Sequence, residues 1–167
     1  MFDRFIKIFA SLKLTVVVLA LALVLVFVGT MAQDPLGLYL VQDRFFKSIF
    51  VDYASMAAAV KKILQMVGVY LPPSTVQDVL SAPRIPVFPG GYLIGAVFLV
   101  NLLTAYAERF KPTREKSGLG LYLAHGGLLL LVVGQFATDM LQVESFVRLT
   151  EGQPKNYSES GSRMELA

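Results

Sequence analysis

Side chains that could do chemistry are few in this 167-residue chain, and the most informative is its single histidine, His125. It lies about seven residues after Gly118 in a long apolar stretch, so a helical rise of about 1.5 Å per residue would put it about 10 Å inside that stretch. An imidazole there can relay protons, coordinate a metal or serve as an axial ligand of haem. It can equally be a neutral side chain that joins two helices by hydrogen bonds.

Two other polar side chains, Asn101 and Gln135, also lie in apolar stretches. For Asn101 we expect an interhelical hydrogen bond. Glycines surround the histidine and leave room for either a packed helix or a flat macrocycle; they are Gly118, Gly120, Gly126, Gly127 and Gly134. One histidine cannot hold a bare metal ion, but it can supply one axial ligand of a haem. The second ligand would then come from another chain.

The sequence carries none of the common soluble-enzyme motifs. It has no phosphate-binding glycine loop, no nucleophile elbow and no HExxH pair. It also contains no cysteine, which excludes disulfides, thiol redox chemistry and thiolate metal ligation. The net charge is +3, but the basic residues are not gathered into a stripe with interleaved aromatics, so a nucleic-acid partner is not expected.

The elements that hold these residues are predicted to be membrane helices. The chain is 55% apolar and only 16% charged, too apolar for an ordinary soluble domain. Its apolar residues are concentrated in uncharged stretches long enough to cross a bilayer core of about 30 Å. We therefore predict an all-α membrane protein with transmembrane helices at 14–33, 90–107 and 117–138. Residues 1–13, 34–89, 108–116 and 139–167 would lie outside the membrane.

Lysine and arginine set the expected orientation. They predominate in the N-terminal segment 1–13 and in the short loop 108–116, and both positions are typical of the cytoplasmic side. The N-terminus is therefore predicted to be cytoplasmic and the C-terminus extracytoplasmic, in a multi-pass protein of the plasma (inner) membrane. The first apolar stretch is longer than a signal peptide's and lacks a good cleavage site, so we expect an uncleaved span.

The outer segment 34–89 contains two sets of apolar residues at helical spacing. We expect an amphipathic helix that lies in the membrane interface or against the bundle; packing on a partner's outer domain is the alternative. The sets are Phe45, Phe46, Ile49, Phe50 and Tyr53, then Met56, Val60, Ile63, Leu64 and Val67. Pro72 and Pro73 would end the helix.

The rest of the outer segment is expected to be short or extended. Ser74, with Gln77 three residues later, predicts a cap for a short turn. Further prolines, at positions 83, 86 and 89, would keep the chain extended up to the second span. Residues 139–167 have β character around Phe146, which predicts the start of a β-rich extracytoplasmic region.

Several short motifs together resemble the ResB-like (CcsB-type) cytochrome c biogenesis proteins. The resemblance covers most of the chain, and its most specific part is the His-Gly-Gly-Leu of the third span followed by Glu-Gly-Gln and Tyr-Ser-Glu. The matching pieces are 11–15, Gly29-Thr30, 88–91, 101–103, Arg109-Phe110, Gly120, 125–128, Gly134, Glu144, Leu149, 151–153 and 156–159.

This resemblance implies a subunit of the system II machinery, in which a CcsA-type (ResC) partner and this chain deliver haem b across the membrane to apocytochrome c. His125 would be an axial ligand of the transiting haem iron, and the partner would supply the tryptophan-rich loop and further histidines. The chain would not be an enzyme by itself, but a haem-handling subunit of a cytochrome c synthase complex. Family members usually continue into a large outer domain and a fourth span, and some carry histidine where Tyr106 stands here.

Two other functions remain open from the residues alone. The chain could be a b-type cytochrome or quinone-reactive electron-transfer subunit, with His125 on a resident haem. It could also be a non-catalytic membrane scaffold in which His125 has only a structural part.

Overall fold

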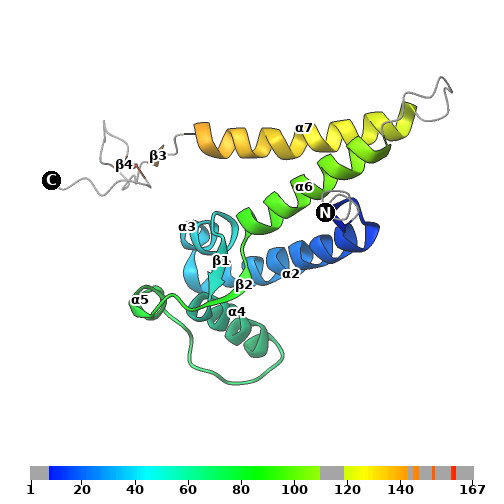
Figure 1. Cartoon of the computed structure of the whole chain (residues 1–167). Helices are drawn as coiled ribbons and strands as arrows, with labels where there is room; N and C mark the ends of the chain where they lie inside the picture. The colour runs from blue at the N-terminus through cyan, green and yellow to red at the C-terminus, as the bar shows by residue number, and fades with distance from the viewer. Residues whose placement is uncertain (1–7, 110–118, 143–144, 147–151, 153–158, 161–167) are drawn as a thin grey trace. The chain divides into compact units, whose positions relative to one another are not determined.

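The computed structural model of the chain describes residues 8–109, 119–142, 145–146, 152 and 159–160, and they are mostly helical (Figure 1). The chain divides into two compact units, Met1–Val132 and Val133–Ala167. In order, the elements are α2 (Leu12–Leu36), α3 (Leu38–Val41), the π-helix η1 (Gln42–Phe46), β1 (Phe50–Asp52), α4 (Tyr53–Met66), α5 (Val76–Ser81), β2 (Pro86–Pro89), α6 (Gly91–Arg109), α7 (Leu119–Leu141), β3 (Ser145–Phe146) and β4 (Glu159–Ser160).

Among the described helices, two are long and apolar enough to cross a membrane. These are α2, over its whole length, and the Tyr122–Leu141 part of α7. The expected span at 90–107 is the helix α6, but its apolar stretch Gly91–Ala107 is shorter than those two. The structure thus supports two membrane-length helices rather than the three that hydropathy predicted. The loop 108–116 lies largely outside the described residues.

Helix α2 ends where its chain turns back on itself. Gly37 follows the helix with a φ of 78°, a conformation that favours glycine, and its N–H donates to Gln33 O. The chain then folds back through α3 and η1. The Phe46 ring comes to rest against Gly29, where an added Cβ would lie 2.9 Å from the ring. A larger residue at position 29 would therefore push the Phe46 ring away from α2.

The start of α6 is covered by the same folded-back segment. A Cβ on Gly91 would lie 2.3 Å from Phe46 O, and one on Gly90 would lie 2.3 Å from Ser48 O. The Gly90 N–H donates to Ile49 O, and the Tyr92 N–H donates to Ser48 O. Backbone carbonyls of residues 48–49 therefore satisfy N–H groups that the first turn of a helix leaves unpaired.

A small antiparallel sheet joins the middle of the outer segment to its end. Strand β1 pairs with β2, with Val51 opposite Phe88, and the register shifts between Val51 and Asp52. The proline-rich stretch before α6 is indeed extended, as its sequence predicted. Strands β3 and β4 form one two-residue pair, so the described residues give no support to a β-rich C-terminal region; most of 139–167 lies outside them.

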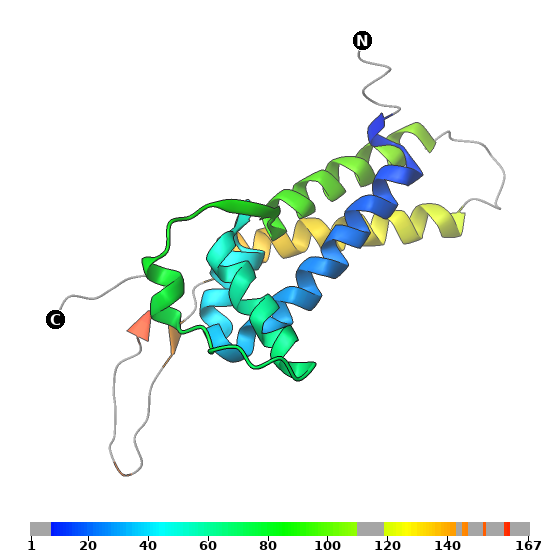
Figure 2. The ribbon, with the colours of Figure 1, turned by 90° about the horizontal axis from the view of Figure 1, so that it is seen from below.

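Helix α4 lies alongside the C-terminal part of α2 (Figures 1 and 2). It packs there through small side chains, since its buried residues are Ser55, Ala58 and Ala59. The two alanines belong to the same apolar core as Val28 and Ala32 of α2. The expected amphipathic helix therefore exists over 53–66, but its fully buried residues are small ones; of the predicted large apolar residues, Met56 packs partly buried against the core, while Val60, Leu64 and Val67 are exposed.

Two details of the outer segment differ from the sequence prediction. Residues 45–53 do not continue α4 as one helix, because Phe50–Asp52 pair with β2 and Asp52 caps the start of α4. Helix α5 is capped by Thr75, one residue later than expected. Thr75 and Asp78 form a reciprocal capping box. With Ser74 as the cap, the third residue would have been Gln77, an amide; with Thr75 it is the carboxylate of Asp78.

Candidate functional site

His125 lies in the first half of α7, on a helix that buries little of its surface. The side chain is half-buried, and none of residues 122–142 is buried. The two residues that follow are Gly126 and Gly127, and a Cβ built on either of them would meet nothing within 4 Å. The helix surface next to the imidazole is therefore uncovered at these two glycines.

Tyr122 precedes His125 by one helical turn and is also half-buried. Its ring contacts Tyr106 of α6 edge to face, with centroids 6.4 Å apart and the ring planes at 89°. The contact places this aromatic pair one turn from the imidazole.

Asn101 forms the interhelical hydrogen bonds that its sequence position predicted. It is buried on α6, its Oδ1 accepts from Thr15 Oγ1 of α2 at 2.8 Å, and its Nδ2 donates to Phe9 O. Both polar atoms of its side chain therefore join α6 to α2 and the residues just before it. Gln135, the third polar residue of the apolar stretches, is exposed on α7.

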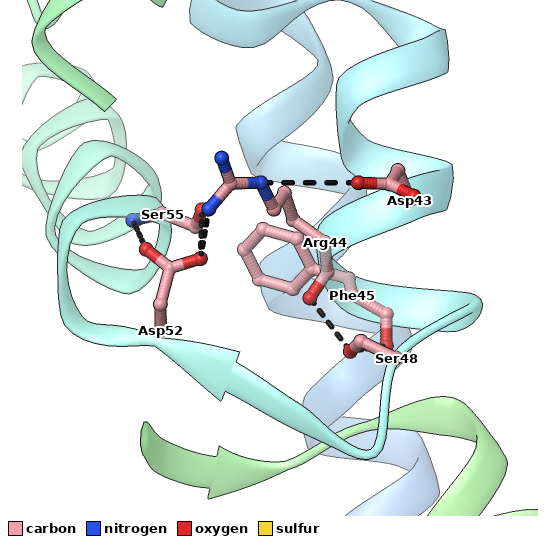
Figure 3. Close-up of polar contacts among 6 residues, drawn as sticks. All are labelled: Asp43, Arg44, Phe45, Ser48, Asp52 and Ser55. Carbon is pink, nitrogen blue, oxygen red and sulfur yellow. Dashed lines mark hydrogen bonds and ion pairs between the residues drawn. The ribbon is translucent and has the colours of Figure 1, made fainter. Parts of the chain in front are cut away.

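A buried polar cluster in the outer segment was not predicted from the sequence (Figure 3). Arg44 of η1 and Asp52 at the start of α4 are each only 5% exposed, and Arg44 Nη1 lies 3.1 Å from Asp52 Oδ2. The Ser55 N–H donates to Asp52 Oδ1 and the Ser55 hydroxyl to Oδ2. The only sequence signal for this ion pair was a basic and an acidic residue among aromatic residues. Because no regular helix or strand brings residues eight apart into contact, that signal could not predict the pair.

The electrostatics of this cluster favour a structural role for the Arg44–Asp52 pair over a catalytic one. Burial alone would raise the pKa of the Asp52 carboxyl, but the hydrogen bonds from Ser55 and the charge and hydrogen bond of Arg44 outweigh it and hold the pKa below its ordinary value. A carboxylate held ionised in this way is a poor proton acceptor. The pair ties η1 to the start of α4 and offers no nucleophile.

Within the described residues, no three histidine, cysteine, aspartate or glutamate side chains are grouped so as to hold a metal ion. As the single histidine of the chain, His125 is the imidazole that could serve as one axial ligand of a haem. Comparisons with protein-family models, with curated proteins and with solved structures found no match to this chain.

Proposed function

We propose that this chain is a membrane subunit of a cytochrome c maturation complex, in which it binds haem through His125 and helps to deliver it across the membrane. The observation that carries the proposal is the placement of the single histidine, half-buried on α7 beside two glycines with open space around them. The motif resemblance to ResB-like proteins gives this imidazole its particular substrate, haem b.

The partner follows from ligand number. A six-coordinate haem needs two axial ligands, and this chain has one histidine and no cysteine. The second ligand would come from a CcsA-type (ResC) membrane subunit. No residue of Tyr122–Leu141 in α7 is buried, so the side chains along this whole stretch would be available for contact with such a partner. Thioether formation with apocytochrome c would take place on the partner, and this chain alone would not be an enzyme.

The proposal includes a topology. Helices α2, α6 and α7 would each cross the plasma membrane, with the N-terminus cytoplasmic and α3 to β2 on the outer side. His125 would then lie in the cytoplasmic half of the bilayer, where haem made inside the cell enters. A reporter fused after Lys116 is expected to stay cytoplasmic, and one fused after Glu151 to be exported; the opposite pattern would contradict this topology.

The test of the function is His125→Gly in the complex with the CcsA-type subunit. The variant should lose the copurified haem absorbance and cytochrome c maturation, and added imidazole should restore both, because the glycine leaves space for the free ring. Gln135→Ala on the same helix is the matched control and should change neither.

Three other outcomes would contradict the proposal. Loss of the protein together with the haem would favour a scaffold with a structural histidine. Loss of a non-exchanging haem while c-type cytochromes still mature would favour a resident b-type cytochrome. Unchanged haem content and unchanged maturation would exclude His125 as a ligand.

A further inference from the structure

Helix α4 leaves a row of large apolar side chains without cover. Tyr53, Val60, Leu64 and the helix-ending Val67 are 62%, 43%, 39% and 78% exposed. At about 100° per residue they fall within about 60° of one another around the helix. We call these four residues the outer stripe. They lie on the side of α4 opposite Ser55, Ala58 and Ala59, through which the helix packs on α2.

Lys61 and Gln65 lie on a third side of α4, whereas Lys62 lies on the side that faces α2. Lys62 forms an ion pair with Asp34 near the end of α2, with Nζ and Oδ2 2.6 Å apart. Lys61 lies towards α5, which packs on α4. There the pKa of Asp78 is lowered, chiefly by the hydrogen bond from the Thr75 N–H and additionally by the charge of Lys61. The helix thus has a face towards α2, a charged edge and an apolar face.

The ion pair also fixes the depth of α4 along α2. Asp34 and its neighbour Gln33 are the first strongly polar residues after the long apolar run of α2, so they mark where that helix leaves the hydrocarbon. Ala58 and Ala59 share the apolar core of Val28 and Ala32, which precede Asp34 along α2. Helix α4 therefore lies level with the last turns of the span and close to the lipid headgroups.

We infer that α4 is seated in the outer leaflet, with the outer stripe against lipid acyl chains and Lys61 among the headgroups. A helix with an apolar face, a lysine edge and no acidic residue within Tyr53–Met66 has the composition of an interfacial membrane helix. Tyrosine at the end of the stripe suits the membrane–water boundary, where its ring is apolar and its hydroxyl is solvated. Lipid is favoured over a protein partner because α4 lies level with the last apolar turns of α2, at the place where the proposed span leaves the hydrocarbon.

The chain has no cysteine, so single-cysteine variants label cleanly. We would place a fluorescent nitrobenzoxadiazole group on Val60→Cys and Leu64→Cys in the full chain, reconstituted in phosphatidylcholine–phosphatidylglycerol vesicles. Quenching by aqueous iodide is compared with quenching by lipids that carry a nitroxide near the headgroup. Lys61→Cys is the matched control on the charged edge, and Leu23→Cys is the control on the span.

The stripe positions should be quenched at least threefold more weakly by iodide than position 61 and strongly by shallow nitroxide lipids, while position 23 responds to deep nitroxides. Equal iodide quenching at positions 60, 61 and 64, with position 23 in lipid, would overturn the inference. Protection from both quenchers would also overturn it, because the stripe would then be covered by protein. Haem plays no part in this measurement, so its outcome is independent of the proposed function.

Discussion

Replacing Arg44 with methionine is expected to loosen the outer segment, because it leaves the Asp52 carboxylate buried without its cation. Both residues are only 5% exposed and the pair is 3.1 Å apart, so water screens the remaining charge poorly. Removing one partner of such a pair costs about 3–5 kcal/mol. The two hydrogen bonds from Ser55 remain and favour the lower end, about 3 kcal/mol.

The double variant Arg44→Met with Asp52→Asn should recover most of this loss. Asparagine is a good helix N-cap, so the contact with Ser55 N–H at the start of α4 is kept. The native pair is also imperfect: among the described residues nothing accepts a hydrogen bond from the buried Arg44 Nε, and the Asp43 carboxylate is 3.9 Å away. Removing both charges should therefore cost only about 1 kcal/mol.

Hydrogen exchange of the α4 amides in lipid nanodiscs measures both effects. Since about 1.4 kcal/mol corresponds to a tenfold change in an equilibrium, the single variant should exchange about 100-fold faster and the double variant less than about tenfold faster. If the effects of the two substitutions simply add, or if the single variant exchanges at the wild-type rate, the pair is not a buried and coupled unit.

Three further predictions concern other contacts. First, the pKa of Asp52 is lowered in the folded protein, so the ionised carboxylate stabilises the fold fully above the ordinary carboxyl pKa of about 4. This stabilisation is lost as the pH falls through the lower folded-state pKa, so hydrogen-exchange protection of the α4 amides should fall in acid. Asp52→Asn should make that protection less dependent on pH. Second, Gly91→Ala forces a Cβ against the Phe46 carbonyl and should lower the free energy of unfolding in detergent by about 1–3 kcal/mol. Gly120→Ala, where a Cβ meets no atom within 4 Å, should not lower it. Equal effects of the two substitutions would contradict the packing of residues 46–48 against the start of α6. Third, Asn101→Ala removes the hydrogen bonds to both Thr15 and Phe9 O and should cost about 1–2 kcal/mol in the same assay. Adding Thr15→Val should cost little more, because the Thr15–Asn101 bond is already lost; fully additive losses would argue against that bond.

Local patterns predicted the parts of this fold that depend on neighbours in sequence. Hydropathy located α2 and α7, and a lone amide in an apolar helix predicted the Asn101 bridge. The outer segment was harder, because helical spacing at 45–53 is overruled by strand pairing between residues more than thirty apart. The Arg44–Asp52 pair was missed for the same reason. For the site, the sequence singled out His125, and the structure adds the open space beside Gly126 and Gly127.

The backbone carbonyls that accept hydrogen bonds from the first N–H groups of α6 affect how long this helix must be to span a membrane. A helix end normally needs water, and in hydrocarbon an unsatisfied backbone group is costly, so a lipid-exposed span must reach both interfaces. Here residues 48–49 act in place of water for Gly90 and Tyr92. In the proposed topology, where α6 is a span, its apolar stretch Gly91–Ala107, about 26 Å at 1.5 Å per residue, could thus begin beneath the bilayer surface without stretching or thinning the membrane around it.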